Sequence, residues 1–381
     1  MAKSAGQVVK RGDRTYLVRV PMGTDAKGKR SYHNHTVHGT LKDAQAYLSA
    51  ALRERDLGTF VEPGKDTLGD YLDKWLAEAA KGRVRGQTFE TYEARLRRYV
   101  RPALGDRRLC DLTPLDLQTL YGGMTARGLS PQTVRQTHAP LRLALEQAVR
   151  WGMLSRNVAT LVDLPHQEKR EMQALTPEEA QAFLQAAQED PWRALWALAL
   201  DTGMRPEEYL ALRWSDVDLP GRTVRVQQVL VRPKAGPGYR FEPPKTPKSR
   251  RTIPVGGATA KALSAHKVCK ARERLAAGVP DGDLGLVFAA ENGEPLRLNN
   301  LTRRHFKTLL AKAGLSATIR LYDLRHTCAT LLLAAGENPK VVSERLGHAS
   351  VTLTLDTYSH VLPTMQRAAA DRLDAILHGG R

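Results

Sequence analysis

The first 60 residues change from a strand-like to a helix-like pattern of apolar positions. Val8-Val9 and Tyr16–Val20 are rich in β-branched and aromatic residues, and turn residues separate the two runs. From Leu41 to about Leu57 the spacing is that of a helix, and Thr40 stands at its N-cap position. The pattern predicts a small sheet packed on one helix, followed by a Gly- and Pro-containing linker at 58–64.

The next hundred residues, 67 to about 164, have a helical pattern throughout. Apolar residues recur at spacings of three and four at its start. Thr113-Pro114 and Ser130-Pro131 each place proline just after a capping hydroxyl, which is typical of a helix start. A short polar linker at 165–171 ends this region.

The third region is mixed. A helix start at Leu175–Glu179 and an apolar helix at Trp192–Leu200 precede two runs with strand character, Val224–Val231 and Thr252–Val255. The rest is mostly helix to about Leu377. The chain is therefore predicted to be mainly α with small β elements. Its predicted domains are a three-stranded sheet with one helix (1–62), a helical domain (63–166) and a mixed α/β domain (172–381).

Charge points to a polyanionic partner. The 381 residues carry a formal net charge of +18, which favours nucleic acid over a generic soluble surface. The segment from Lys81 to Arg108 contains nine basic and three acidic residues. The segment from Arg232 to Arg251 contains seven basic residues and one acidic residue, Glu242. We expect surfaces of this lopsided sign to contact phosphates.

Several other classes of protein are disfavoured. The three cysteines, Cys110, Cys269 and Cys328, form no CxxC pair, so neither a disulfide framework nor a thiolate zinc site is expected. No apolar run suggests a signal peptide or a membrane span, and a cytoplasmic protein without membrane contact is expected. Residues 23–29 have the spacing of a phosphate-binding loop, but Arg30 stands where Ser or Thr would bind magnesium. His33-Asn34-His35 spells a nuclease-like tripeptide without further metal ligands, so no metal or cofactor is predicted.

The strongest chemical signal is a set of motifs in the C-terminal region. Each motif alone would be unremarkable, but their combination and order are specific. They are residues 202–208 (TGMRPEE), 244–254 (PKTPKSRRTIP), 322–327 (YDLRHT), 346–350 (LGHAS) and 355–360 (LDTYSH).

This set resembles the tyrosine recombinases, the phage-type integrases, over essentially the whole chain. The resemblance implies a site-specific recombinase that cuts and rejoins double-stranded DNA at attachment sites. It implies a 3′-phosphotyrosyl intermediate, a Holliday junction and a homotetramer on DNA, with DNA-bending accessory proteins as further partners. The first domain resembles an arm-type DNA-binding domain, the helical domain a core-type (SAM-like) DNA-binding domain, and the third a catalytic domain. A nucleoid-associated location follows.

The resemblance also assigns roles to side chains. Tyr358 is the nucleophile. An unperturbed phenol is only about 0.1% ionised at pH 7, so neighbouring groups must activate it. Arg205 and Arg325 offer forked donors to the phosphate. His348 hydrogen-bonds the scissile phosphate, and Lys245, expected on a β-hairpin turn, protonates the leaving oxygen. Glu208 resembles the acidic residue of the family that orients the first arginine.

One position departs from the family pattern, in which the second arginine usually follows a His-x-x. In this chain Tyr322 stands in place of that histidine. Its hydroxyl can donate a hydrogen bond but is a poor base near pH 7. His326 lies four residues later and cannot simply substitute for it. Tyr322 either keeps the donor role or merely packs, and the group that accepts the proton of Tyr358 is left open.

Two alternative functions share part of this signal. A non-catalytic DNA-binding regulator would lack part of the set, whereas Arg205, Arg325 and Tyr358 are all present. A type IB topoisomerase-like enzyme shares the chemistry, but the arm-like first domain favours integration. The predicted C-terminal helix, Met365–Leu377, has apolar positions at Ala369, Leu373 and Leu377, and packs either on its own domain or on a neighbouring protomer.

Overall fold

The chain divides into two compact units, Met1–Glu168 and Lys169–Arg381. The computed structural model describes residues 6–24, 28–58, 60–62, 64–168, 172–233, 238–277, 284–358, 370–371 and 373–379. The division falls within the polar segment 165–171. Among the described residues, no helix combines the length and apolar character needed to cross a membrane.

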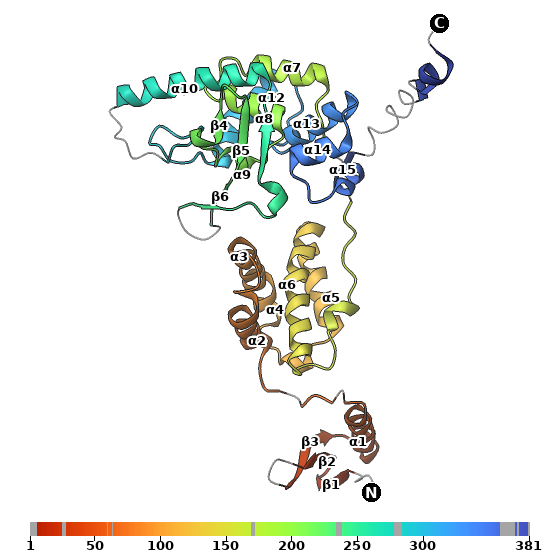
Figure 1. The fold of residues 1–381 in the computed structure, drawn as a ribbon. Helices are drawn as coiled ribbons and strands as arrows, with labels where there is room; N and C mark the ends of the chain where they lie inside the picture. Colours follow the sequence, from red (N-terminus) through yellow and green to blue (C-terminus); the bar gives the residue numbers. More distant parts are fainter. Residues whose placement is uncertain are drawn as a thin grey trace. The chain divides into compact units, whose positions relative to one another are not determined.

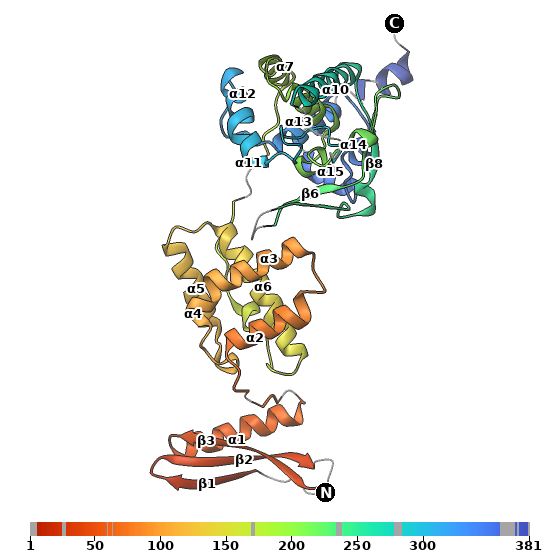
Figure 2. The ribbon, with the colours of Figure 1, turned by 90° about the vertical axis from the view of Figure 1, so that its left-hand side faces the viewer.

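The first unit begins with an antiparallel sheet in the order β1-β2-β3. Its strands are β1 (Gln7–Gly12), β2 (Thr15–Thr24) and β3 (Arg30–His38), and helix α1 (Leu41–Asp56) lies along the sheet (Figure 2). Thr40 caps α1 through a reciprocal pair of hydrogen bonds with Asp43, as the sequence predicts. Ala44 and Ala51 of the helix pack against strand residues such as Val18. The predicted sheet-plus-helix arrangement is confirmed.

The remainder of this unit is helical (Figure 1). Thr113 and Ser130 cap the two helices that begin with proline, which confirms both predicted starts. The helical segments are α2 (Leu68–Trp75), η1 (Leu76–Ala80), α3 (Gly86–Arg95), η2 (Leu96–Val100), α4 (Arg101–Leu104), η3 (Leu109–Asp111), α5 (Pro114–Ala126), α6 (Pro131–Arg150) and η4 (Val158–Leu161). They share one apolar core, to which Tyr71, Leu96 and Leu141 contribute fully buried side chains.

The second unit surrounds a core centred on α8, in which Leu195, Trp196 and Leu198 are completely buried. Two small antiparallel sheets, β4-β5-β8 and β6-β7, lie in it. Its first half contains α7 (Pro177–Ala186), α8 (Arg193–Thr202), α9 (Pro206–Tyr209), η5 (Trp214–Asp216), β4 (Val217–Asp218), β5 (Thr223–Val226), β6 (Val229–Val231), β7 (Arg240–Glu242), η6 (Pro247–Ser249) and β8 (Arg251–Pro254). Its second half contains α10 (Gly257–Ala277), α11 (Leu298–Asn300), η7 (Leu301–Phe306), α12 (Lys307–Lys312), α13 (Asp323–Ala334), α14 (Pro339–Leu346) and α15 (Val351–Tyr358).

Two sequence expectations need correction or fall outside the described residues. The run Val224–Val231 is not one strand: it breaks at Gln227-Gln228, because β5 pairs with β8 whereas β6 pairs with β7. Gln228 instead donates a hydrogen bond from its side chain to the Ala211 carbonyl, at 2.9 Å. The predicted C-terminal helix, Met365–Leu377, lies partly outside the described residues. Its described positions, 370–371 and 373–377, are helical, and its docking stays a prediction.

Candidate active site

A sharp reversal at the end of α8 delivers Arg205. Gly203 ends the helix in the left-handed region, with φ of +61°. The backbone angle favours glycine, and a Cβ at this position would lie 2.5 Å from the Leu346 side chain, which would have to shift. Met204 then turns into the core, and Arg205, in extended conformation, becomes the N-cap residue of α9.

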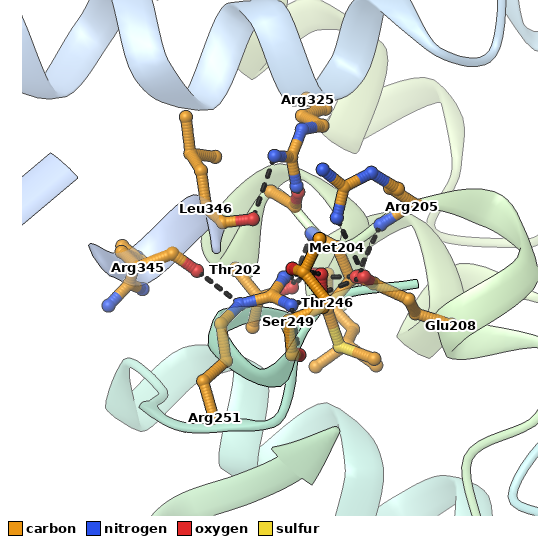
Figure 3. A network of polar contacts seen from close by, with 12 residues as sticks. Thr202, Met204, Arg205, Glu208, Thr246, Ser249, Arg251, Arg325, Arg345 and Leu346 are labelled. Carbon is orange, nitrogen blue, oxygen red and sulfur yellow. Dashed lines mark hydrogen bonds and ion pairs between the residues drawn. The ribbon is translucent and has the colours of Figure 1, made fainter. Parts of the chain in front are cut away.

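A buried carboxylate holds Arg205 in place (Figure 3). Glu208 accepts hydrogen bonds from the Arg205 backbone N–H and from Arg205 Nη1, both at 2.9 Å, and is only 2% exposed. Burial opposes ionisation of both partners. Nearby positive charges nevertheless lower the pKa of Glu208: that of Arg251 contributes most, followed by that of Arg205. The Glu208 carboxylate in turn raises the pKa of Arg205. The expected role of Glu208 as the residue that orients Arg205 is consistent with these contacts.

Sequence reasoning missed Arg251, which binds the other side of this carboxylate. Arg251 Nη2 donates to Glu208 Oε2 at 2.9 Å, and its Nε donates to the Arg345 carbonyl at 2.6 Å. The side chain is 7% exposed. A signal was available, because Arg251 and the buried Ile253 alternate with exposed Thr252 on β8 and so share its inner face.

The second arginine of the motif set is buried at the start of α13. Arg325 is 2% exposed and donates from Nη1 to the Gly203 carbonyl and from Nη2 to the Leu346 carbonyl, both at 2.7 Å. These two contacts use two of its five N–H donors. Burial and the nearby Arg205 guanidinium lower the pKa of Arg325 to about 10. Two like charges therefore lie close together, an arrangement that an anion between them would stabilise.

His348 follows directly on the left-handed Gly347, which ends α14. Its Nδ1 lies 2.7 Å from the hydroxyl oxygen of Thr354, a completely buried residue of α15. Burial and the charges of Arg325 and Arg205 lower the pKa of His348 to about 4. The ring is therefore neutral at physiological pH.

Tyr358, the last residue of α15, is 1% exposed and belongs to a small apolar cluster. Its hydroxyl lies 2.9 Å from His326 Nδ1. Burial raises the pKa of Tyr358 well above that of a free phenol, although Arg325 acts in the opposite direction. Burial also lowers the pKa of His326. The structure thus pairs the predicted nucleophile with a histidine to which the motif set assigns no role.

The two remaining predicted residues, Tyr322 and Lys245, are both exposed. Tyr322 is the N-cap residue of α13, 38% exposed, and a hydrogen bond between it and Arg205 contributes to the raised pKa of that arginine. Lys245 is exposed and does not lie on the β6–β7 turn, contrary to expectation. It follows β7 on the connection to β8, where three prolines prevent a continuous strand ladder. Lys248 of the same connection donates to the Ala349 carbonyl, beside His348, at 2.7 Å.

Comparison with known proteins decides the family. Residues 173–365 match the model described as the phage integrase family, and residues 67–124 match that of the phage integrase N-terminal SAM-like domain. The chain belongs to the phage integrase family. It is a tyrosine-type, site-specific DNA recombinase, as the motif set predicts.

Two relatives align with this integrase over nearly its whole length. A protein named tyrosine recombinase XerC-like, from Caldanaerobacter subterraneus subsp. tengcongensis, is 29% identical, covering 98% of this chain and 99% of its own. An integrase from Streptomyces ambofaciens is 30% identical, covering 96% of this chain and 94% of its own.

Solved structures of integrases share its fold. The integrase of transposon Tn1549, in complex with a circular intermediate DNA, is 26% identical with a TM-score of 0.69, covering 81% of this chain and 100% of its own. Lambda integrase, solved as a tetramer bound to a Holliday junction, is 20% identical with a TM-score of 0.57, covering 92% of this chain and 94% of its own.

Proposed function

We propose that this integrase cleaves DNA by attack of the Tyr358 hydroxyl on a phosphodiester held by Arg205 and Arg325. The observation that carries the proposal is the pair of like-charged guanidiniums. Each is oriented by other groups, Arg205 by Glu208 and Arg325 by two backbone carbonyls. Burial lowers the pKa of Arg325 and of His348; beside it, the charge of Arg205 lowers the pKa of Arg325, and both arginines lower that of His348. The site therefore has an excess of positive charge suited to a phosphate.

Each residue then has one task. Arg205 and Arg325 donate to the non-bridging oxygens, where preorganised donors contribute about 2.7–4 kcal/mol each to lowering the barrier. His348, neutral and held by Thr354, donates to the same phosphate, and Tyr322 donates from its hydroxyl. Lys245 protonates the leaving 5′ oxygen, for which its exposed connection must approach the DNA.

The covalent intermediate conserves the energy of the broken bond. The Tyr358 oxygen forms a bond to phosphorus as the bond to the 5′ oxygen breaks, which leaves a 3′-phosphotyrosine. A 5′ hydroxyl from another strand then attacks this ester and releases the tyrosine. Exchange of two strands between two duplexes produces a Holliday junction, and the balance of bonds requires no nucleotide hydrolysis.

The three predicted domains divide the DNA between them. Residues 1–62 bind arm sites, residues 63–166 bind one face of the crossover site and residues 172–381 bind the other, with catalysis. The nine basic residues between Lys81 and Arg108 supply phosphate contacts in the second domain. Four protomers act together on two duplexes at attachment sites, with DNA-bending accessory proteins as partners. The reaction takes place on the nucleoid in the cytoplasm.

A nicked suicide duplex carrying the native site tests the proposal. Wild type should form a covalent protein–DNA adduct, and Tyr358→Phe should form none. Tyr209→Phe is the matched control, because the Tyr209 hydroxyl is buried with no hydrogen-bond partner in the described part of the chain. DNA binding without any adduct would indicate a regulator instead. Adducts accompanied by relaxation but never by strand exchange would indicate a topoisomerase-like enzyme.

A further inference from the structure

The contact between His326 and Tyr358 joins two helices at the reacting atom. His326 lies on the first turns of α13, directly after Arg325, and Tyr358 is the last residue of α15. His326 Nδ1 lies 2.9 Å from the Tyr358 hydroxyl oxygen, which is hydrogen-bond distance for proton transfer. The ring of His326 also lies 5.4 Å from that of Tyr322, so the histidine stands between the two tyrosines.

We infer that His326 is the catalytic residue that takes the proton from Tyr358 during cleavage and returns it during rejoining. The inference rests on the proposed function of Tyr358 as nucleophile. In cleavage the O–H bond of Tyr358 breaks, its proton moves to His326 Nδ1, and the oxygen forms the bond to phosphorus. The bond from phosphorus to the 5′ oxygen breaks, and that oxygen takes its proton from a separate acid, Lys245. Rejoining runs each transfer in reverse.

The surroundings of His326 fit an acceptor. For Nδ1 to accept, the ring proton must sit on Nε2, and a neutral imidazole has this tautomer available. Burial and the charges of Arg325 and Arg320 favour the neutral ring, while Asp323 opposes them. The Asp323 carboxylate itself accepts from the Arg320 backbone at 2.7 Å and from the Arg320 guanidinium at 3.1 Å.

The other groups of the site are less suited to the task. Arg205 and Arg325 are cations without acceptor atoms. The Nδ1 of His348 is already engaged by Thr354, at 2.7 Å. The Tyr322 side chain is a phenol, whose oxygen is a poorer proton acceptor than an imidazole nitrogen. His326 is the neutral nitrogen base that contacts the Tyr358 hydroxyl within the described residues.

The substitution His326→Gln separates proton transfer from packing. A glutamine amide oxygen can still accept a hydrogen bond from Tyr358, but it cannot take the proton. Single-turnover cleavage of the suicide duplex should slow by about 100-fold, the lower range for loss of a general base. His305→Gln is the matched control, because His305 lies in the same unit, is partly buried and has its Nδ1 3.0 Å from Asp190. The His305→Gln variant should cleave like wild type.

Two chemical substitutions distinguish the step affected. A 5′-bridging phosphorothiolate has a leaving group that needs no proton, so it should rescue Lys245→Ala but not His326→Gln. A fluorinated tyrosine at position 358 is more acidic, so it should restore much of the rate of His326→Gln.

The outcomes separate this inference from the proposed function. Absence of an adduct with wild type would refute the role of Tyr358 itself. If wild type forms the adduct and His326→Gln cleaves within about threefold of it, far short of a lost general base, His326 is not the acceptor. Rescue of His326→Gln by the phosphorothiolate would overturn the inference by assigning the histidine to the leaving group. A slow variant that the fluorinated tyrosine does not rescue would overturn it by assigning a structural role.

Discussion

The substitution Glu208→Gln removes one negative charge from the buried centre of the arginine network. The Glu208 carboxylate accepts from Arg205 twice and from Arg251 twice, at 2.9 to 3.2 Å. Glutamine preserves the shape of the side chain but replaces an acceptor oxygen with an NH₂ group that points at a guanidinium. Arg251, whose side chain is only 7% exposed, is left without its counter-charge.

The expected loss follows from the burial of both partners. Removing one member of a buried ion pair typically costs about 3–5 kcal/mol, because the other charge stays desolvated. Arg251 keeps two neutral acceptors, the carbonyls of Arg345 and Ser249, so we expect the lower end of this range. A loss of about 3 kcal/mol raises the opening equilibrium constant of this unit by about 150-fold, and the exchange rate of amides that exchange through that opening rises in proportion.

Hydrogen exchange of the α8 amides, followed by mass spectrometry on the full chain, measures this change. The control is Glu207→Gln, which removes the same charge from the neighbouring, exposed position of the same helix and should change the free energy of opening by less than about 0.5 kcal/mol. If Glu208→Gln and Glu207→Gln agree within that margin, the ion-pair reasoning is wrong. Arg251→Met should recover part of the loss in the double variant, since no unpaired buried charge remains.

The effect should also depend on pH with a defined sign. The pKa of Glu208 is lowered in the folded chain by Arg251 and Arg205, although burial acts against them. Its contribution to stability is therefore complete above the unfolded value of about 4.3 and is lost as pH falls through the folded pKa. The difference between wild type and Glu208→Gln should be largest at neutral pH and shrink in acid.

Two further predictions concern cleavage of the suicide duplex. Thr354→Val removes the hydroxyl that holds His348 and should slow cleavage by up to about tenfold, the equivalent of one hydrogen bond, whereas Thr354→Ser should retain the rate. Tyr322→His restores the usual family residue. Because His326 already serves as the base, the rate should change by less than about tenfold, and a gain of 100-fold or more would contradict that role.

Sequence patterns predicted the elements that local interactions determine. The helix capped by Thr40 and the helix starts at Thr113 and Ser130 depend on side chains within a few residues of each cap, so the sequence alone predicts them. The division of Val224–Val231 into two strands was not. Both halves have strand character, and the break depends on β8 and β7, whose pairing with them is set by the tertiary fold.

The same distinction applies to the site. The motif set included Arg205, Arg325, His348 and Tyr358 and assigned Glu208 to Arg205, but the partners of the other three required the fold. The acceptors of Arg325 are backbone carbonyls at Gly203 and Leu346, which carry no side-chain signal. His326 was visible as a residue one helical turn after Tyr322, yet its contact lies 32 residues away. Only the packing of α13 against α15 reveals it.

On the proposed mechanism, the pairing of Tyr358 with His326 would allow a buried phenol to serve as the nucleophile. Burial disfavours both the phenolate and the imidazolium, so the pair rests in its neutral form. Arg325 also repels a protonated His326. A phosphate bound between Arg205 and Arg325 offsets their charge and so makes the imidazolium less unfavourable. Arrival of the DNA would then raise the basicity of His326 when the nucleophile is needed, and the unbound enzyme would keep its tyrosine protonated.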